Sequence, residues 1–305
     1  MESLASWLYT EVRSEQDYGY DLENKQQPSK LYHYTTLDGL LGIIQTKTLY
    51  ASDAMFLNDS SELQYGKELI IESINHLISE KDFQTTYYFD FGDKEIELLN
   101  SVRNQLSKTT FKATYIVCFT TESDILSQWR GYANNSGVRI GFNRDSLYEA
   151  FYNPYMPVNY NRRSQLKLIE ETLGILLTYI VHKDRQNLPK SDVELLPEAI
   201  ASILLPYVSF FKDNVFKEER EHRLIYNPSR ESVKDSVLPI FYRNNGKFIV
   251  PYVKLECKSE LLPITDIMVG QSPYSQKIKH GIELLLKSNG YDKIKVNLSK
   301  IPYIP

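Results

Sequence analysis

The first part of the chain alternates short apolar runs with one amphipathic segment. Residues 31–34 and 49–52 are rich in apolar and β-favouring side chains, which predicts two strands. Between them, leucine and isoleucine recur at i, i+3, i+4 and i+7 over residues 37–44, which predicts a helix with one apolar face. A threonine at position 35 or 36 can cap that helix, because its hydroxyl oxygen accepts a bond from the first turn. The pattern predicts strand, short helix, strand.

The same periodicities extend to the end of the chain. Further helices are predicted near residues 62–79, 94–107, 144–152, 162–184, 192–212 and 274–288. Further strands are predicted at 114–120, 136–142, 221–226, 236–242, 248–256, 263–270 and 293–298. Because these strands do not alternate regularly with helices, the pattern favours a mixed α+β fold over a doubly wound parallel sheet.

Composition narrows the class of protein. Apolar residues make up 42% of the 305 residues and charged residues 24%, with a net charge of -4, so no overall positive field attracts nucleic acid or anionic lipid. Local basic patches are still compatible with that total. No signal-peptide pattern and no apolar run near the ~20 residues of a membrane span occurs. We expect a cytoplasmic protein whose two cysteines, Cys118 and Cys257, are buried free thiols.

The two strands that flank the first helix carry the first candidate site. His33, Tyr34 and Thr35 end one strand, and Tyr50 and Ser52 lie in the next. If these strands are neighbours, the side chains can face one cleft that binds a small molecule. The alternative is packing, with the histidine bonded to a backbone carbonyl.

A polar turn follows the second strand. Asn58 and Asp59 are typical turn and helix-capping residues, and Glu62 falls in the first turn of the next helix, where the helix dipole favours a carboxylate. The same three residues are also candidates for a cleft.

A charged run precedes the strand predicted at 221–226. If the chain is extended from Glu219 onward, Glu219, Glu221 and Arg223 share one face, because side chains alternate along a strand. Such a face is either solvated or lines a cleft where a carboxylate holds a ribose hydroxyl or acts as a base.

Two residues between the predicted strands at 114–120 and 136–142 are further candidates. Trp129 is either a core anchor or part of a ligand site, and Arg130 can bind a phosphate or pair with a carboxylate. Neither of the usual glycine-rich phosphate loops occurs in the chain.

In their order along the chain, several short motifs resemble a bacterial family known as domain of unknown function 2971. The matching segments are LYHYT at 31–35, Asn58-Asp59 with Glu62, CFT at 118–120, WRGYA at 129–133, GVRIGF at 137–142, EREHR at 219–223, PITDIMVG at 263–270 and SKIPY at 299–303. The resemblance covers about residues 30–305.

More distantly, the opening resembles ADP-ribosyltransferase toxins, which share a strand with a histidine, a short helix and a second strand. That resemblance implies that His33 and Thr35 bond the ribose of NAD and that Tyr50 or Tyr34 packs on nicotinamide. It implies that Glu221 holds the ribose hydroxyl as positive charge develops and that Glu219 orients the acceptor. Ser52, Trp129, Arg130 and Arg223 complete the expected NAD site.

Together these observations lead us to expect an α+β protein with an ADP-ribosyltransferase-like split sheet. We expect an N-terminal helix and linker at 1–29 and one domain at 30–305, with a helical insertion at about 162–212. The expected function is NAD-dependent ADP-ribosyl transfer, without a metal, by a toxin or phage-defence effector. Its acceptor would be nucleic acid or protein, and a neutralising or regulatory protein would control it.

Two alternatives stay open at this point. One is a catalytically inactive module of the same fold that senses a nucleotide or a phage component. The other is a metal-dependent nucleic-acid-processing enzyme with Asp59, Glu62, Glu219 and Glu221 as ligands.

Overall fold

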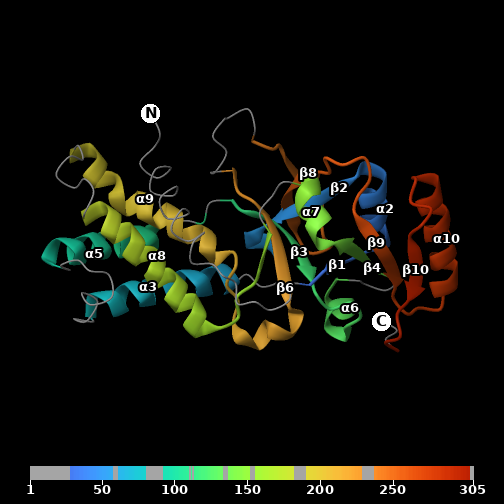
Figure 1. Cartoon of the computed structure of the whole chain (residues 1–305), viewed down its shortest axis with the longest axis horizontal. Coiled ribbons are helices and arrows are strands. Elements are labelled where there is room, and N and C mark those ends of the chain that lie inside the picture. The colour runs from blue at the N-terminus through green and yellow to red at the C-terminus, as the bar shows by residue number, and fades with distance from the viewer. Residues whose placement is uncertain are drawn as a thin grey trace. The chain divides into compact units, whose positions relative to one another are not determined.

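The computed structural model describes residues 28–57, 61–79, 92–109, 111, 113–132, 137–151, 155–181, 190–228 and 237–302 (Figure 1). These residues belong to two compact units. A helical unit is drawn from segments 59–112 and 159–215, and a sheet unit from segments 26–58, 113–158 and 216–305. The predicted N-terminal helix and most of the predicted loop at 81–93 lie outside the described residues.

In the described part of the helical unit, four helices pack around one apolar core. They are α3 (Ser61–Ser79), α5 (Asp93–Lys108), α8 (Arg162–Tyr179) and α9 (Lys190–Val208). The leucines and isoleucines predicted to face inward from α3 are buried at Leu69, Ile70, Ile74 and Leu77. Where α3 meets the end of α9, Gly66 lies directly against Val208. The crossing is close because glycine has no Cβ.

The sheet unit contains a ten-stranded mixed sheet. Its strands are β1 (Lys30–Thr35), β2 (Thr48–Asp53), β3 (Tyr115–Thr120), β4 (Val138–Asn143), β5 (Tyr155–Pro157), β6 (Glu221–Tyr226), β7 (Ile240–Asn244), β8 (Ile249–Glu256), β9 (Ile264–Val269) and β10 (Lys295–Leu298). Its helices are α2 (Leu37–Thr46), α6 (Leu126–Tyr132), α7 (Arg144–Phe151) and α10 (Ser275–Ser288). The connections include the 3₁₀ turns η1 (Ala54–Phe56) and η3 (Asn214–Glu219). The pairs are antiparallel except β9 with β10.

The sheet splits at strand β3. One edge of β3 pairs with β6 along its whole length. The other edge is shared, because β1 pairs with it only at Thr120 and β2 only at Ile116 and Tyr115. Beyond these points β1 continues with β4 and β2 continues with β8. Two groups of strands therefore diverge from the middle of β3.

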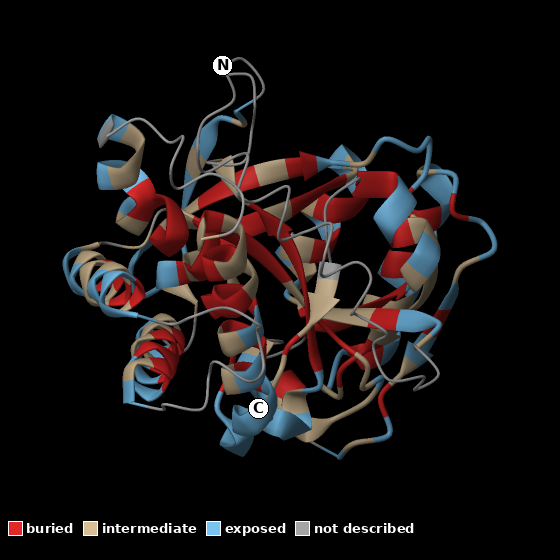
Figure 2. Ribbon diagram, turned by 60° about the vertical axis from the view of Figure 1, so that its left-hand side comes forward, coloured by how far each residue is buried: buried red, intermediate tan, exposed pale blue. Residues whose placement is uncertain are grey.

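Helix α2 connects the two diverging strands, as the sequence predicts. Its N-cap is Thr36, whose hydroxyl oxygen accepts from the N–H of Gly39 at 3.1 Å. The buried face differs from the predicted one in one position, because Ile43 is buried while Leu41 is 41% exposed. The helix lies over the core face of the sheet, where burial is continuous along the central strands (Figure 2).

The predicted strands and helices of the described chain are observed, with shifted ends. The strand predicted at 236–242 is β7, at Ile240–Asn244, and β5 was not predicted because it is only three residues long. Both cysteines are free, and they are half-buried rather than buried.

Candidate functional site

His33 lies where β1 leaves β3. Its Nδ1 atom is 2.8 Å from the carbonyl oxygen of Cys118, on the edge of β3 that faces the split. The imidazole also contacts the ring of Phe119, with centroids 5.7 Å apart. A backbone carbonyl lies near the plane of the sheet, so this bond holds the ring at the split between the two groups of strands. The packing interpretation of His33 is correct in that a carbonyl satisfies one ring nitrogen.

The same contact fixes the tautomer of His33, and burial fixes its charge. Burial lowers the pKa of the imidazole below its usual 6.5, the bond to Cys118 opposes this, and the positive charge of Arg243 lowers it further. The ring is therefore neutral at pH 7, with its proton on Nδ1, which donates to Cys118. Among the described residues Nε2 has no hydrogen-bond partner, so it is left as an acceptor for a hydroxyl donor.

Aromatic and cationic side chains gather on the β2 side of the split. Arg243 of β7 donates from Nη2 to Ser52 Oγ at 2.8 Å. Tyr50 stacks on Tyr252 of β8, with centroids 4.5 Å apart. The ammonium of Lys254 lies 4.3 Å from the ring centroid of Phe241, next in this row. The positive charge of Arg243 also acts on His33. The strands β1 and β2 are not paired with each other as the sequence interpretation assumed, because both pair with β3.

Glu221 and Arg223 form a buried ion pair on β6. Arg223 donates from Nε and Nη2 to the two carboxylate oxygens of Glu221, at 2.8 and 2.9 Å. The side chains are 7% and 2% exposed, so the pair is not a solvated charged face. The two residues share one face of the strand, as alternation predicts.

The prediction that Glu219 shares one strand face with Glu221 and Arg223 is wrong. The strand begins at Glu221, while Glu219 ends the turn η3 and Arg220 has a φ of 41°. This left-handed residue breaks the alternation, so Glu219 does not share the strand face. Its backbone carbonyl accepts instead from Thr120 Oγ1 at 2.6 Å.

Strand pairing sets the position of Glu221 relative to β1. Glu221 is opposite Thr120, which is opposite Tyr32, so all three side chains lie on one face of the sheet. At ~4.8 Å per strand, about 10 Å separates the backbones at Glu221 and Tyr32. Strand β3 lies between the carboxylate and the split.

Tyr34 and Trp129 pack against each other in a small core. Their rings meet edge to face with centroids 4.9 Å apart, and both are buried. The hydroxyl of Tyr34 donates to the carbonyl of Glu122, and Trp129 Nε1 donates to Asp124 at 2.7 Å. Trp129 is therefore the core anchor that the sequence allowed, while Arg130 is exposed on α6. Thr35, half-buried, borders Gly39 at the start of α2.

The three candidates of the polar turn are either outside the described residues or part of the helical unit. Asn58 and Asp59 lie outside the described residues. Glu62 is in the helical unit, where its carboxylate lies 2.7 Å from Lys212 Nζ and both side chains are at most 7% exposed. Within the described part of the chain, no cluster of three or more His, Cys, Asp or Glu side chains could hold a metal ion.

Two arginines of the sheet, Arg139 and Arg243, were missed in the sequence analysis. Arg139, 2% exposed in β4, bonds Asp266 of β9 and lies over the ring of Tyr32 at 4.5 Å. The signal was present, because an arginine in the middle of the apolar run GVRIGF needs a buried partner. Arg243 was missed as well, in a strand whose other residues are mostly exposed.

The comparison with known families gives one result. Residues 128–224 match the family described as protein of unknown function (DUF2971), over about a third of the chain. The match runs from α6 to β6, so it contains Trp129 and the Glu221–Arg223 pair. His33 and Ser52 precede its first residue and are not part of it. No curated protein and no solved structure matches the chain. In the part of the chain that the structure describes, no helix is long and apolar enough to cross a membrane.

Proposed function

We propose that this protein transfers ADP-ribose from NAD to an acceptor, using a site at the split between β1 and β2. The observation that carries the proposal is the bond from His33 Nδ1 to Cys118, which holds a neutral imidazole where the two groups of strands diverge. The divergence supports an ADP-ribosyltransferase-like split sheet.

The side chains around the split suit a dinucleotide. His33 Nε2 can accept from a ribose hydroxyl, and Arg243 carries a positive charge for the pyrophosphate. Tyr50, rather than the core residue Tyr34, offers a ring next to the split for nicotinamide.

The chemistry needs a carboxylate close to the sugar. The bond between C1′ of the ribose and the nicotinamide nitrogen breaks, and the electron pair leaves with nicotinamide. A nucleophile on the acceptor then forms the new bond to C1′ and gives up its proton. Positive charge on the sugar is largest in the transition state, so a carboxylate there accelerates the reaction. We assign this role to Glu221, which would have to exchange Arg223 for the substrate and reach the sugar across β3.

The test is calorimetric titration of NAD into the wild-type protein and into His33→Ala, with nicotinamide release measured in parallel. The matched control is His280→Ala, because the side chain of His280 is 73% exposed on α10. We expect wild type and control to bind NAD and His33→Ala to lose most of the affinity while remaining folded by circular dichroism. Failure of folded wild-type protein to bind NAD would refute the proposal.

One observation favours a second candidate, a nucleotide-binding module without catalysis. The carboxylate of Glu221 is buried and held at both oxygens by Arg223, an arrangement that also serves stability alone. Glu221→Gln separates the two. A transferase would keep NAD binding and lose nicotinamide release by at least about 100-fold, whereas a binding module would release no nicotinamide in either form.

A transferase of this kind would act as a toxin or a phage-defence effector on nucleic acid or protein, with a neutralising partner. Expression of wild type and of Glu221→Gln in a bacterial host tests that role. Growth arrest by wild type alone would support it. No metal takes part in the proposed reaction, so a chelator should leave nicotinamide release unchanged.

A further inference from the structure

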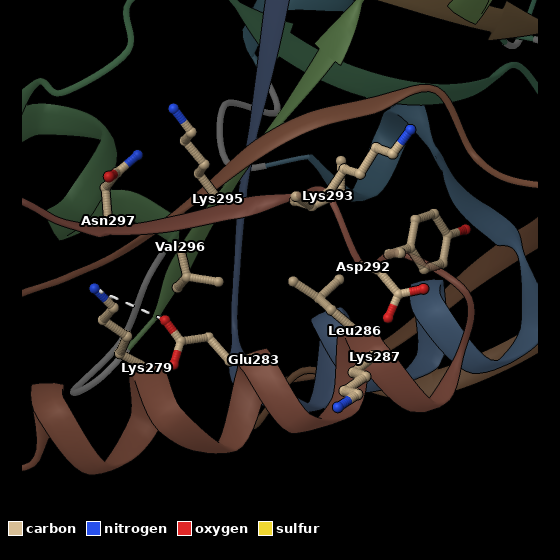
Figure 3. Close-up of a pocket in the computed structure, with 11 residues that line it drawn as sticks. Lys279, Glu283, Leu286, Lys287, Asp292, Lys293, Lys295, Val296 and Asn297 are labelled. Carbon is tan, nitrogen blue, oxygen red and sulfur yellow. Dashed lines mark ion pairs between the residues drawn. The ribbon is translucent and has the colours of Figure 1, made fainter.

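A basic groove lies along the last helix and strand of the sheet unit. It measures about 520 Å³ and is bordered by the second half of α10, the following turn and β10 (Figure 3). Four lysines line it, at Lys279, Lys287, Lys293 and Lys295, against the two acidic residues Glu283 and Asp292. The groove is thus positively charged in a chain whose net charge is -4.

The fold places these lysines by simple periodicity. On α10, Lys279, Glu283 and Lys287 follow each other at four-residue spacing, so they share one side of the helix. On β10, Lys295 and Asn297 alternate with the buried Val296. Val296 and Leu286 belong to the core and form the floor, which leaves the lysines at the rim. The charge is a property of a packed surface rather than of a loose tail.

Few acidic side chains neutralise the positive charges of these lysines. Lys279 Nζ lies 3.8 Å from one carboxylate oxygen of Glu283, and His280 Nδ1 lies 4.0 Å from the other. Lys287, Lys293 and Lys295 make no ion pair with any described residue and are exposed. Over residues 275–300 the chain has six lysines and two acidic residues, so this stretch alone carries +4. Clustering of unpaired like charges costs stability unless an anion binds there.

The direction of the ammonium groups indicates the shape of that anion. In Figure 3 the side chains of Lys293 and Lys295 point away from α10, and that of Lys287 points away from the strand. They do not converge on one point, so they cannot enclose a single phosphate. Lys293 and Lys295 extend on one side of the groove and Lys287 on the other, so the charges follow its two rims, which suits a polymer better than a compact anion. A concave, rimmed surface also fits a narrow strand better than a flat bilayer.

We propose that this groove binds the phosphate backbone of nucleic acid, without reading its sequence. Lysine ammonium groups contact phosphates as point charges, and each contact releases a counterion from the polymer. Asn297 adds an exposed amide donor beside Lys295. The proposal does not depend on the proposed NAD chemistry, because His33 and Glu221 take no part in the groove.

The test measures binding of a fluorescently labelled single-stranded oligonucleotide by anisotropy, over a series of salt concentrations. The variant is Lys287→Gln with Lys293→Gln and Lys295→Gln. The control removes three exposed lysines from the helical unit, with Lys94→Gln, Lys108→Gln and Lys167→Gln. Both variants change the net charge by the same amount, so a difference between them reports the groove.

We expect the groove variant to bind about tenfold more weakly or worse, and the control to bind like wild type. The slope of log K against log salt should fall by about 0.7 per lysine removed, or about 2 in all. Equal effects of the two triple variants, or no binding by wild type, would overturn the proposal. So would binding of wild type to phosphatidylserine vesicles but not to the oligonucleotide. NAD binding should be unchanged in the groove variant, which keeps this test separate from that of the proposed function.

Discussion

The Nδ1 atom of His33 lies 2.8 Å from the carbonyl oxygen of Cys118 and joins β1 to β3 beyond the last residue pair of their ladder. In a continuous sheet a backbone N–H would occupy that carbonyl. Here β1 has already diverged from β3 and is paired only with β4, so the imidazole takes the place of the missing N–H. One side chain therefore closes the edge of β3 and still offers its second nitrogen to the split.

The first prediction concerns the pH dependence of stability. Because the pKa of His33 is lower in the folded protein than its usual 6.5, the unfolded chain takes up the proton more readily. The contribution of neutral His33 to the free energy of unfolding is fully present above pH 6.5. It falls as the pH drops from there towards the folded pKa, by up to about 1.4 kcal/mol per pH unit.

His33→Asn tests this, because the asparagine amide can still donate to Cys118 and does not titrate. We expect a smaller loss of unfolding free energy between pH 7 and pH 5 than in wild type, measured by urea denaturation. A slope remains, because burial also lowers the pKa of His222. His280→Asn is the control and should follow wild type. An unchanged slope in His33→Asn would show that His33 does not carry the effect.

The second prediction concerns the buried pair of Glu221 and Arg223. Removing one partner leaves the other charge buried, which costs about 3–5 kcal/mol in such pairs. Glu221→Gln should lower the unfolding free energy by about 2 kcal/mol or more, since the amide retains one acceptor. A double-mutant cycle with Arg223→Gln should give a coupling energy above about 1 kcal/mol. Additive effects would mean that the two side chains act independently.

The third prediction compares two helical glycines. A Cβ at Gly66 would lie 2.6 Å from Val208 Cγ1 and 3.0 Å from its Cα, whereas a Cβ at Gly281 meets nothing within 4 Å. Gly66→Ala should destabilise the protein by about 1–3 kcal/mol through overpacking. Gly281→Ala should stabilise it by about 0.5–1 kcal/mol, because alanine restricts the unfolded chain. Thermal unfolding of both variants checks the contrast, and the same sign for both would contradict it.

The fourth prediction concerns Asp266. Burial would raise the pKa of its carboxyl, but the bonds and charge of Arg139 outweigh burial and hold the pKa below its usual 3.8. The stabilisation is therefore present above about pH 4 and is lost as the pH falls through the folded pKa. Asp266→Asn should cost about 3 kcal/mol at pH 7, with a smaller difference from wild type at pH 3.

Denaturant unfolding at both pH values gives that comparison. Asp145→Asn is the matched control, because Asp145 pairs with Arg144 at the surface and is 73% exposed. Its effect should stay below about 1 kcal/mol. If Asp266→Asn lowers the unfolding free energy no more than this control does, the ion pair with Arg139 is not the source of the stabilisation.

Local pattern was sufficient for most of the secondary structure. The i, i+3, i+4, i+7 spacing over residues 37–44 predicted α2, and the expected threonine cap at position 35 or 36 is Thr36. The charged run at 219–223 shows where this reasoning stops. Alternation predicted correctly that Glu221 and Arg223 lie on one face. Glu219 does not lie on that face, because Arg220 has a left-handed backbone conformation. A backbone reversal of one residue leaves no trace in side-chain periodicity.

The sequence by itself determined most of the helices and strands, though not α6 or β5, and that the fold is mixed α+β. It also indicated His33, Ser52 and Glu221 as candidate site residues. These follow from periodicity and residue chemistry, which act over a few positions. Only the tertiary structure decided which side chains meet. Cys118 is 85 positions from His33, and Arg243 is 191 positions from Ser52. Contacts of that range depend on how β1 and β2 share one edge of β3, and strand order is set by packing of the whole sheet.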